Sequence, residues 1–285
     1  MNYQKPAQHW IDGKLVREDL AVLPVTDLVI TRGYGAFEAL RTYAGKPFLL
    51  EEHLRRFEKT CIHMNLRCPL NRKELAKAAI QTLKANSFPE SLVRFYVTGG
   101  DAHRFLPEGQ ERLMILIGAH KEPAAWQYES GIAIKTTTLT RQIPLAKTVD
   151  YSAGIRETIL ANRQGYQEVA YLDRRGCLLE GTTFSIFALL GKTLVTPEEG
   201  VLPGCTAAQV IKLARRAGFT IQRSAISPAM LKKASELFIT STTRELLPVV
   251  RVDQQQIGAG VPGPVTRVLH QRFRKSAAAA VKRLS

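Results

Sequence analysis

The chain has 285 residues, which is enough for one large domain or two modest ones around a buried core. It is 45% hydrophobic and 23% charged, as in ordinary globular proteins. No apolar run approaches the ~18 residues that a membrane span needs. The net charge of +15 allows acidic partners, but the basic residues are spread along the sequence without interleaved base-stacking aromatics. We therefore expect neither a nucleic-acid partner nor a membrane partner.

The N-terminus and the cysteines both favour a cytoplasmic protein. The N-terminal stretch has no apolar signal-peptide core. The four cysteines have neither CxxC spacing nor the density of a disulfide framework, so reduced thiols are expected. The basic C-terminal stretch "HQRFRKSAAAAVKRLS" is expected to be a frayed helix end or a disordered extension.

The first half of the chain mixes predicted strands and helices. In chain order, the segments are a hairpin over 9–16, two β-rich runs over 35–50, helices over 50–66 and 72–88, and strands over 91–100 and 112–120. Residues 121–130 combine proline, charge and turn residues without a period. We interpret them as a linker between a smaller α/β domain (1–120) and a larger domain (131–285).

The second half continues the same mixture. Its predicted segments are strands over 132–139 and 168–173, a strand-like stretch over 177–197, helices over 153–165 and 205–218, and further strands over 235–250. Thr206 is placed to cap the helix over 205–218, and Gly218 is placed to end it. The elements predict an α+β fold with sheets that are more mixed than doubly wound.

Lys147 is the first candidate for chemistry. It follows the apolar, proline-led stretch "IPLA" instead of standing on a charged surface. An amine removed from water favours its neutral form, which is a nucleophile that forms a Schiff base with an aldehyde. Taken alone this is a weak signal, because a lysine just before a helix is usually solvated.

Two turns are candidate anion sites. In "VLPGCT" a Pro-Gly turn leads into a helix, and the backbone N–H groups of Cys205 and Thr206 are expected to be open to a phosphate. The turn "STT", Ser241 to Thr243, offers hydroxyl groups after a strand, and Arg56 could supply positive charge. Each feature is more often structural than functional when it occurs alone.

Glu180 is a carboxylate in an apolar context. It ends the run "CLLE" and precedes the uncharged stretch "GTTFSIF". An isolated buried charge is costly, so Glu180 is expected to be paired. Its partner is either an arginine in the core or the ring nitrogen of a cofactor.

The ordered motifs together resemble one family. "RGYGAFEALRTYAGKPFLLEEHLRRFEK", "AKTVDY", "GYQEVAYLD", "LEGTTFSIF", "VLPGCT" and "ELFITSTTRELLPV" are similar to the class IV aminotransferases. These are fold type IV pyridoxal phosphate enzymes and include branched-chain aminotransferases, D-amino acid transaminases, (R)-amine transaminases and aminodeoxychorismate lyase. The resemblance runs from about His9 to beyond Gly263, and it implies a two-domain α+β architecture and a homodimer.

The resemblance also implies residue roles. Lys147 matches the lysine that binds pyridoxal 5′-phosphate as a Schiff base and moves the proton. Tyr151 matches the tyrosine at the cofactor's phenolic oxygen, and Glu180 matches the carboxylate that keeps the ring nitrogen protonated. Arg56 matches the phosphate arginine. The ring-packing and phosphate-cradling positions are Leu202, Gly204, Cys205, Thr206 and Thr242, with Ser241 beside them.

Two positions depart from the family pattern. Ser185 stands where the family usually has asparagine, and Ala207 stands where it usually has arginine. Neither is a necessary cofactor contact, so the expected cofactor is unchanged. Both departures suggest a branch away from the best-known members.

Arginines are the natural clamps for a substrate carboxylate. The candidates are Arg32, Arg41 and Arg94, while Arg104 is expected on the surface. Familiar D-amino acid transaminases have an arginine where this chain has Gly99. Branched-chain enzymes usually carry an aromatic residue at the position of Arg32.

The pair Arg32 and Arg94 resembles a less common subgroup of D-amino acid transaminases, which makes D-amino acids the leading substrate prediction. The expected reaction is a ping-pong transamination between an amino acid and a 2-oxo acid. A branched-chain L-amino acid aminotransferase and an aminodeoxychorismate lyase are the alternatives, although the lyase usually has "FTTxR" where this chain has "FEALR". A degenerate member without turnover and a basic nucleic-acid-binding protein are more distant alternatives.

Overall fold

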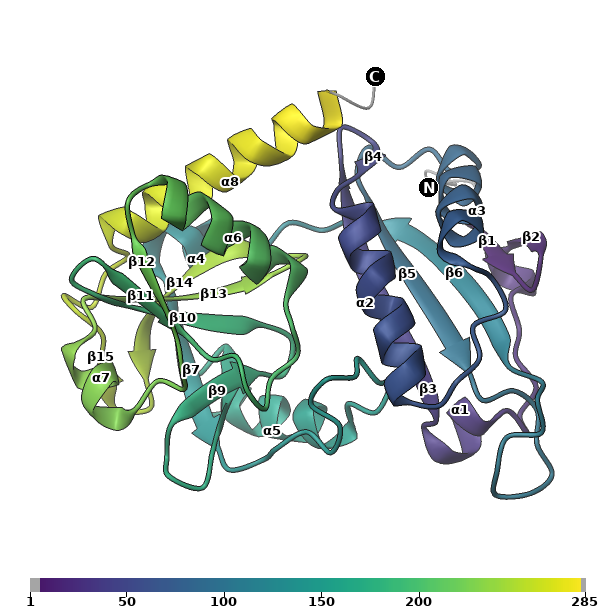
Figure 1. The fold of residues 1–285 in the computed structure, drawn as a ribbon, viewed down its shortest axis with the longest axis horizontal. Coiled ribbons are helices and arrows are strands. Elements are labelled where there is room, and N and C mark those ends of the chain that lie inside the picture. Colours follow the sequence, from purple (N-terminus) through teal and green to yellow (C-terminus); the bar gives the residue numbers. More distant parts are fainter. Residues whose placement is uncertain (1–5, 283–285) are drawn as a thin grey trace. The chain divides into compact units, whose positions relative to one another are not determined.

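The computed structural model describes residues 6–282, and the chain divides into two compact units (Figure 1). Of the described residues, the N-terminal unit comprises 6–121, Ala146–Asp150 and 280–282. The C-terminal unit comprises Glu122–Leu145 and Tyr151–Ala279. Within residues 6–282, no helix is both long and apolar enough to cross a membrane.

The unit boundaries differ from the predicted division in two places, because Ala146–Asp150 and residues 280–282 belong to the N-terminal unit. The segment that carries Lys147 belongs to the N-terminal unit, although the sequence suggested that it lies in the domain over 131–285. The predicted linker over 121–130 contains a short helix, α4 (Ala125–Ser130). The main chain of Lys147 and that of Tyr151 are therefore grouped with different units, although only three residues separate them.

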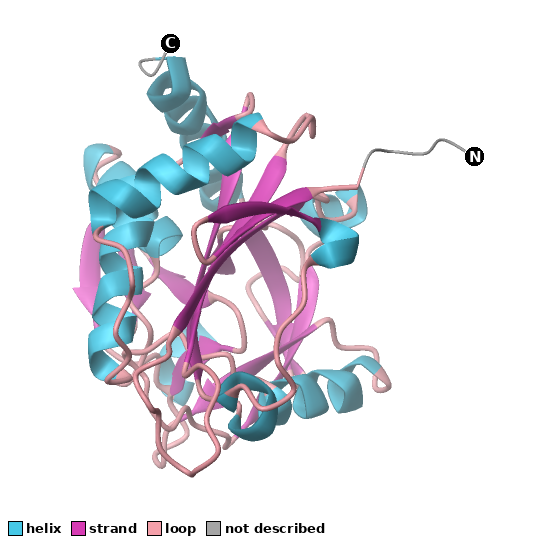
Figure 2. Cartoon of the chain, turned by 90° about the vertical axis from the view of Figure 1, so that its right-hand side faces the viewer, coloured by secondary structure: helices cyan, strands magenta, loops and turns pink. Residues whose placement is uncertain are grey.

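The N-terminal unit is one antiparallel sheet with helices on one face. Its elements are β1 (Gln8–Ile11), β2 (Lys14–Arg17), η1 (Glu18–Leu20), α1 (Leu28–Arg32), β3 (Gly35–Tyr43), β4 (Lys46–Pro47), α2 (Leu50–His63), α3 (Arg72–Lys84), β5 (Ser91–Thr98) and β6 (Arg112–Ala119). The strand order is β2-β1-β6-β5-β3-β4. The strands run side by side in Figure 2.

The core of this unit follows from the apolar stripes of its helices. Leu54 and Phe57 on α2 and Leu75 on α3 are fully buried against the sheet, where Phe95 of β5 lies against Phe57. Asn71 begins α3 with a reciprocal capping box that also uses Glu74. The sheet and α2 therefore form a rigid support for the side chains that α2 carries.

The C-terminal unit is built on a mixed sheet. Its elements are α4, β7 (Ile132–Thr137), α5 (Ser152–Asn162), β8 (Glu168–Leu172), β9 (Leu178–Gly181), β10 (Ser185–Leu190), β11 (Thr193–Thr196), α6 (Cys205–Arg216), β12 (Thr220–Arg223), α7 (Pro228–Lys233), β13 (Glu236–Ser241), β14 (Glu245–Val252), β15 (Gln255–Gln256) and most of α8 (Pro264–Lys282). The sheet order is β12-β11-β10-β13-β14-β7-β8-β9, with β15 on β14 and an added β9–β10 contact. Phe187 and Phe238 stack at 5.0 Å between ring centroids in its interior.

The α+β prediction is confirmed, with local corrections. The strand-like stretch over 177–197 is three strands, β9 to β11. The helix α6 ends as expected before Gly218, whose φ of +85° suits glycine, but its N-cap is Gly204 and not Thr206. The basic C-terminal stretch is not frayed or disordered up to Lys282, because it forms α8. Residues 283–285 of that prediction lie outside the described residues.

Helix α8 is ordered by an apolar stripe. Leu269, Phe273 and Ala277 recur at a spacing of four residues and are almost fully buried in the C-terminal unit. The charged residues of the stretch occupy other faces of the helix. All four cysteines of the chain fall within the described residues and are free thiols.

Candidate functional site

The main chain of Lys147 is fixed on both sides within the N-terminal unit. The segment Ala146–Asp150 adds to β3, because Phe37 N–H donates to the Lys147 carbonyl at 2.8 Å and Val149 N–H donates to the Gly35 carbonyl at 3.1 Å. On the other side, Lys147 N–H donates to Thr60 Oγ1 at 3.2 Å. Thr60 is fully buried on α2. The lysine therefore leaves a backbone that β3 and α2 hold in place.

The side chain of Lys147 lies against an aromatic ring. Its Nζ is 4.3 Å from the centroid of the Phe37 ring, a distance at which a cation and a ring attract. The apolar approach noted in the sequence contributes less than expected, because Ile143 and Leu145 are 39% and 45% exposed. The apolar neighbour of the amine is thus Phe37, which the sequence did not single out.

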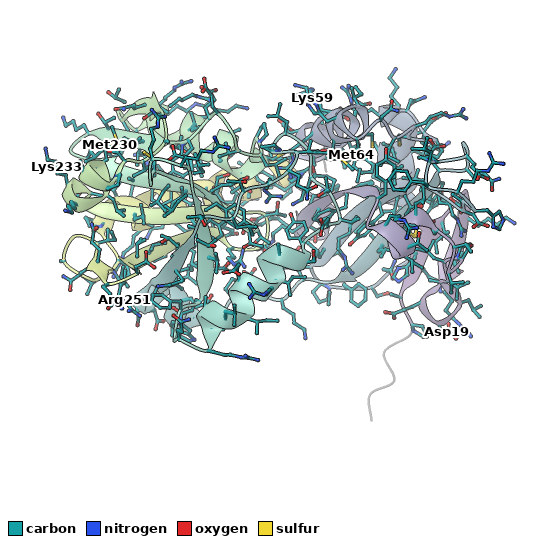
Figure 3. All side chains as sticks on the ribbon, turned by 90° about the horizontal axis from the view of Figure 1, so that it is seen from below. Asp19, Lys59, Met64, Met230, Lys233 and Arg251 are labelled. Carbon is teal, nitrogen blue, oxygen red and sulfur yellow. The ribbon has the colours of Figure 1, made fainter. Side chains whose placement is uncertain are left out.

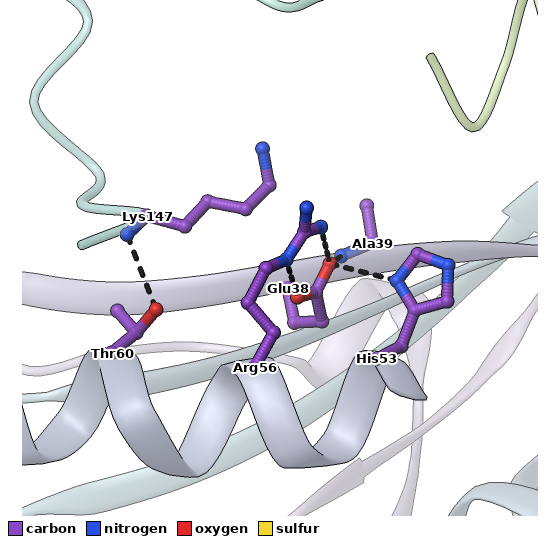
Figure 4. A network of polar contacts seen from close by, with 6 residues as sticks. All are labelled: Glu38, Ala39, His53, Arg56, Thr60 and Lys147. Carbon is purple, nitrogen blue, oxygen red and sulfur yellow. Dashed lines mark hydrogen bonds and ion pairs between the residues drawn. The ribbon is translucent and has the colours of Figure 1, made fainter. Parts of the chain in front are cut away.

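Arg56 makes a bidentate ion pair with Glu38 on β3 (Figure 4). Arg56 Nε donates to Glu38 Oε2 at 2.7 Å, and Arg56 Nη2 donates to Glu38 Oε1 at 2.6 Å. Glu38 Oε1 also accepts from Ala39 N–H at 2.7 Å and lies 3.1 Å from His53 Nδ1. The sequence missed Glu38, although its place in the alternating strand "GAFEALR" could have indicated an inward-facing carboxylate.

Glu38 is completely buried, and its charge depends on these partners. Burial alone would raise the pKa of Glu38, but the charges of Arg56 and His53 and their hydrogen bonds hold it well below its ordinary value. The carboxylate is therefore ionised across the ordinary pH range.

One face of α2 organises this half of the site. His53, Arg56 and Thr60 follow at intervals of three and four residues, which places them along one side of the helix. Figure 4 shows Lys147 and Arg56 extending to the same side of α2. An amine and a guanidinium group are thus presented together by residues of the N-terminal unit.

The predicted carboxylate arginines, Arg32 and Arg94, stand on different elements of the N-terminal unit. Arg32 ends α1, is exposed, and donates to the Thr31 carbonyl at 2.8 Å. Arg94 lies in mid-β5 opposite Ala39, four residues along the strand from Thr98, which pairs with Gly35. At about 3.3 Å per residue, Arg94 lies about 13 Å along β5 from Thr98.

Local contacts account for the other positions that the sequence analysis considered for a carboxylate arginine. Arg41 is buried, and its guanidinium carbon lies 4.4 Å from the centroid of the Tyr43 ring. At Gly99, a Cβ atom would lie 2.8 Å from the Tyr34 ring and 2.9 Å from Leu28, so this strand end cannot carry an arginine without rearrangement. Arg104 is exposed, as expected.

In the C-terminal unit, Glu180 is buried and paired with Arg141. Arg141 Nε donates to Glu180 Oε1 at 2.7 Å, and Leu202 N–H donates to Glu180 Oε2 at 3.2 Å. Arg141 Nη2 also donates to the Thr182 carbonyl at 2.9 Å. Of the two partners predicted for Glu180, the structure provides the arginine.

Arg141 also connects Glu180 to Tyr151. Its guanidinium carbon is 5.5 Å from the centroid of the Tyr151 ring. Burial alone would lower the pKa of Arg141, but Glu180 and Tyr151 raise it above its ordinary value. The sequence analysis missed Arg141, and the available signal was that it is the sole charged residue in 138–146.

Ser185 lies next to two of the predicted cofactor residues of this unit, Glu180 and Gly204. It pairs with Glu180 of β9 on one side and with Thr240 of β13 on the other. A Cβ atom at Gly204 would lie 2.6 Å from Ser185 Oγ, so the turn before α6 passes directly over Ser185. The residue that departs from the family pattern therefore lies between Glu180, Thr240 and the turn at Gly204.

The start of α6 and the end of β13 both offer hydrogen-bond donors. Within residues 6–282, no side chain caps the N-terminus of α6, so a cap does not satisfy its first N–H groups, including those of Cys205 and Thr206. Thr240 Oγ1 is buried and has no hydrogen-bond partner among the described residues. Helix α6 packs against β13. Together, these groups fit an anion such as a phosphate.

The hydroxyl turn after β13 is held at its far end by one ion pair and by hydrogen bonds of Arg244. Arg244 pairs with Glu168 of β8, donates to Thr183 Oγ1 at 2.9 Å, and donates its N–H to Ser241 Oγ at 3.2 Å. Burial raises the pKa of Glu168, and the charge of Arg244 opposes that effect. The turn that carries Ser241 and Thr242 is thereby fixed to the sheet.

Glu245, the next residue, has a φ of +57° and is almost fully buried. Its Oε2 accepts from Arg274 Nε at 2.7 Å and lies 2.6 Å from His270 Nε2, both on α8. The basic C-terminal stretch therefore includes residues that hold this strained position.

Other basic residues of the C-terminal unit lie apart from one another. Lys233 ends α7 and is exposed, and Arg251 lies on β14 with its guanidinium carbon 4.6 Å from the centroid of the Tyr166 ring (Figure 3). Neither belongs to the groups that surround Glu180 or Ser185.

Three comparisons relate the chain to known proteins. The model of the family described as "Amino-transferase class IV" matches residues 35–252, which is more than half of the chain. A "Putative branched-chain-amino-acid aminotransferase" of Methanocaldococcus jannaschii is 31% identical over 273 residues, which cover 93% of this chain and 94% of that protein. The crystal structure of the Escherichia coli branched-chain amino acid aminotransferase is 28% identical, with a TM-score of 0.89 over 95% of this chain and 94% of that one. A second branched-chain amino acid aminotransferase, from T.th. and solved with pyridoxamine 5′-phosphate, has the same fold at 24% identity, with a TM-score of 0.90 over 96% and 94% of the two chains.

Proposed function

The chain belongs to the class IV aminotransferases, which depend on pyridoxal 5′-phosphate, and we propose that it transfers amino groups between branched-chain L-amino acids and 2-oxo acids. The assignment of roles rests on the position of Lys147. Its main chain is held by β3 and α2, and its amine extends to the same side of α2 as Arg56.

The donor set of the chain fits the cofactor. An amine at Lys147 suits the aldehyde carbon, and a buried carboxylate at Glu180 suits a protonated ring nitrogen. The start of α6 and Thr240 Oγ1, which both lack a side-chain partner among the described residues, suit a phosphate, as does the guanidinium group of Arg56. When bound, pyridoxal 5′-phosphate supplies a ring that accepts electron density from the Cα of the substrate.

We assign each residue one task. Lys147 holds the aldehyde carbon, and its Nζ moves the proton between the substrate's Cα and the cofactor. Glu180 holds a proton on the ring nitrogen, and Arg141 and Leu202 N–H orient its two oxygens. Tyr151 orients the phenolic oxygen, and Leu202 and Gly204 pack beside the ring. Arg56, Cys205, Thr206, Ser241 and Thr242 hold the phosphate.

The substrate proposal depends on two lines of support. The relatives described above are named as branched-chain enzymes, which favours branched-chain L-amino acids. The D-amino acid prediction relied on Arg32 and Arg94 acting together, but Arg32 is exposed at the end of α1 and donates to the Thr31 carbonyl, which weakens that prediction. D-amino acids stay a second candidate because Arg94 Nε is buried without a hydrogen-bond partner among the described residues. We further propose a homodimer, as the family resemblance implies, and a cytoplasmic location, as the cysteine pattern favours.

The test is the visible absorbance spectrum of the purified protein with pyridoxal 5′-phosphate. We expect a visible band from the cofactor bound to Lys147, and loss of that band on addition of L-leucine or L-valine. D-alanine and D-glutamate are added in parallel. Bleaching only by the D-isomers would replace the substrate proposal with the D-amino acid candidate.

The matched controls are two lysine variants. Lys147→Ala is expected to abolish the band and its bleaching. Lys59→Ala removes an exposed lysine of α2 and is expected to leave both unchanged. A band that persists in Lys147→Ala with the same bleaching would overturn the role of Lys147.

A further inference from the structure

We infer that Glu38 is a positioning residue that orients Arg56 for the phosphate of the cofactor, an inference that rests on the proposed function above. Glu38 lies on β3 and Arg56 on α2, so the ion pair joins a strand to the helix packed on it. The two arginine atoms that pair with Glu38, Nε and Nη2, form one edge of the guanidinium group. Contact along an edge fixes both the plane and the direction of that group.

The carboxylate of Glu38 is itself held in one orientation. Its Oε1 accepts from the Ala39 N–H of the same strand at 2.7 Å and lies 3.1 Å from His53 Nδ1. His53 is almost fully buried one turn before Arg56 on α2. Both oxygens of Glu38 therefore accept from donors on β3 and α2 (Figure 4). The fixed carboxylate in turn fixes the position of the Arg56 guanidinium group.

Stability alone does not explain a carboxylate at this depth. A buried ion pair gives little net stability, because desolvation of the two charges offsets their attraction. An apolar pair would tie α2 to β3 equally well. The charged pair adds a fixed direction for the guanidinium group of Arg56. A phosphate binds a guanidinium group best when that group is held in a fixed direction.

The test compares two ligands that differ only in the phosphate. Dissociation constants of the cofactor-free protein are measured for pyridoxal 5′-phosphate and for pyridoxal, by titration of intrinsic fluorescence and absorbance. The variants are Glu38→Gln, which keeps the shape and loses the charge, and Glu38→Asp, which keeps the charge and withdraws the carboxylate. We expect Glu38→Gln to weaken pyridoxal 5′-phosphate about tenfold and pyridoxal less than twofold, with Glu38→Asp between the wild type and Glu38→Gln.

The matched control is Glu58→Gln. Glu58 is also on α2 and pairs with an arginine, Arg72 of α3, at 2.6 Å, but it lies at the partly exposed surface. We expect its ratio of the two dissociation constants to equal that of the wild type. If Glu38→Gln does not fold, the Glu38→Asp ratio decides.

The outcomes separate the two proposals. A wild-type protein that binds both ligands equally would remove the basis of the proposed function itself. A wild-type preference for the phosphorylated ligand that persists unchanged in both Glu38 variants would overturn the role of Glu38 alone. If Glu38→Gln weakens the binding of both ligands equally, the role of Glu38 is also overturned, because a purely structural residue would have that effect.

Discussion

Glu38 and Glu180 are two buried carboxylates that each pair with an arginine, and they are held in different ways. Glu38 is joined to Arg56 between a strand and a helix, through two hydrogen bonds along one edge of the guanidinium group. Glu180 is joined to Arg141 through Arg141 Nε, and Arg141 comes from an irregular segment. A backbone N–H, that of Leu202, donates to the second oxygen of Glu180.

The two carboxylates differ in how rigidly they are held and in how accessible they are to a ligand. Glu38 is enclosed by regular elements and has no exposed surface, so its task is to hold a neighbour in place. Glu180 lies at the end of β9, where loops supply its partners, and loops can yield to a ligand. This contrast leads us to expect that loss of Glu38 is felt mainly in stability and phosphate binding, and loss of Glu180 mainly in turnover.

The largest expected effect is on the stability of the Glu38 variant. Glu38→Ala leaves the guanidinium group of Arg56 mostly buried without its counter-ion, which typically costs about 3–5 kcal/mol of unfolding free energy. Urea denaturation measures this loss, with Glu58→Ala as the surface-pair control, which is expected to lose far less stability because water screens its ion pair. Equal losses in the two variants would contradict the special status of Glu38.

Glu180→Gln tests the other side of the comparison. The amide keeps the size of the side chain but cannot hold a proton on the ring nitrogen, so kcat is expected to fall by about 10²-fold or more. Steady-state kinetics with saturating pyridoxal 5′-phosphate measures the fall, and the cofactor is expected to stay bound. A variant with wild-type kcat would show that Glu180 serves Arg141 alone.

Gly204→Ala probes the packing around Ser185. The added Cβ would lie 2.6 Å from Ser185 Oγ and 3.1 Å from the Ala207 Cβ, and overpacking of this kind costs about 1–3 kcal/mol. The double variant Gly204→Ala/Ser185→Ala removes the closer contact, so thermal denaturation is expected to show partial recovery. Without recovery, the clash with Ser185 is not the cause.

The fold was largely predictable because its elements obey local rules. The apolar spacing of Leu54, Phe57 and Cys61 predicts α2, and Asp12-Gly13 predicts the first hairpin. Helix α8 was misread because its alanine run lacks a strong pattern in isolation. Its order comes from the burial of Leu269 and Phe273 in the C-terminal unit, and that tertiary contact is not visible in the sequence of the helix itself.

The candidate site was predictable only in part. Lys147, Arg56 and Glu180 stand in motifs that resemble a family, so their types and spacing identify them. Glu38 and Arg141 are their partners, and a partner is defined by a contact between segments far apart in the chain. Arg56 meets Glu38 across 18 residues and Arg141 meets Glu180 across 39, distances at which sequence spacing carries no pairing information.

The Glu38 pair should also show in the pH dependence of stability. A glutamate whose folded pKa lies below its ordinary value of 4.5 stabilises the fold fully above that value, and the contribution declines as pH falls below it. The difference in unfolding free energy between wild type and Glu38→Gln is therefore expected to shrink by about 1.4 kcal/mol between pH 7 and pH 3.5. Denaturation curves of both proteins at the two pH values measure it, and a constant difference would contradict the ionised pair.

The smallest effect is expected at a third glutamate–arginine pair, Glu245 and Arg274. Glu245 is buried like Glu38, but the side chain of Arg274 is 54% exposed, so water competes for the arginine and screens its charge. Arg274→Ala is expected to cost about 1 kcal/mol or less, because His270 stays in contact with the same carboxylate oxygen. The double variant Arg274→Ala/His270→Ala leaves the carboxylate without either side chain and is expected to lose more than the sum of the single variants. Additive losses in urea denaturation would mean that Arg274 and His270 support Glu245 independently. In that case the exposure of Arg274 would not explain why the Glu245–Arg274 pair is weaker than the Glu38–Arg56 pair.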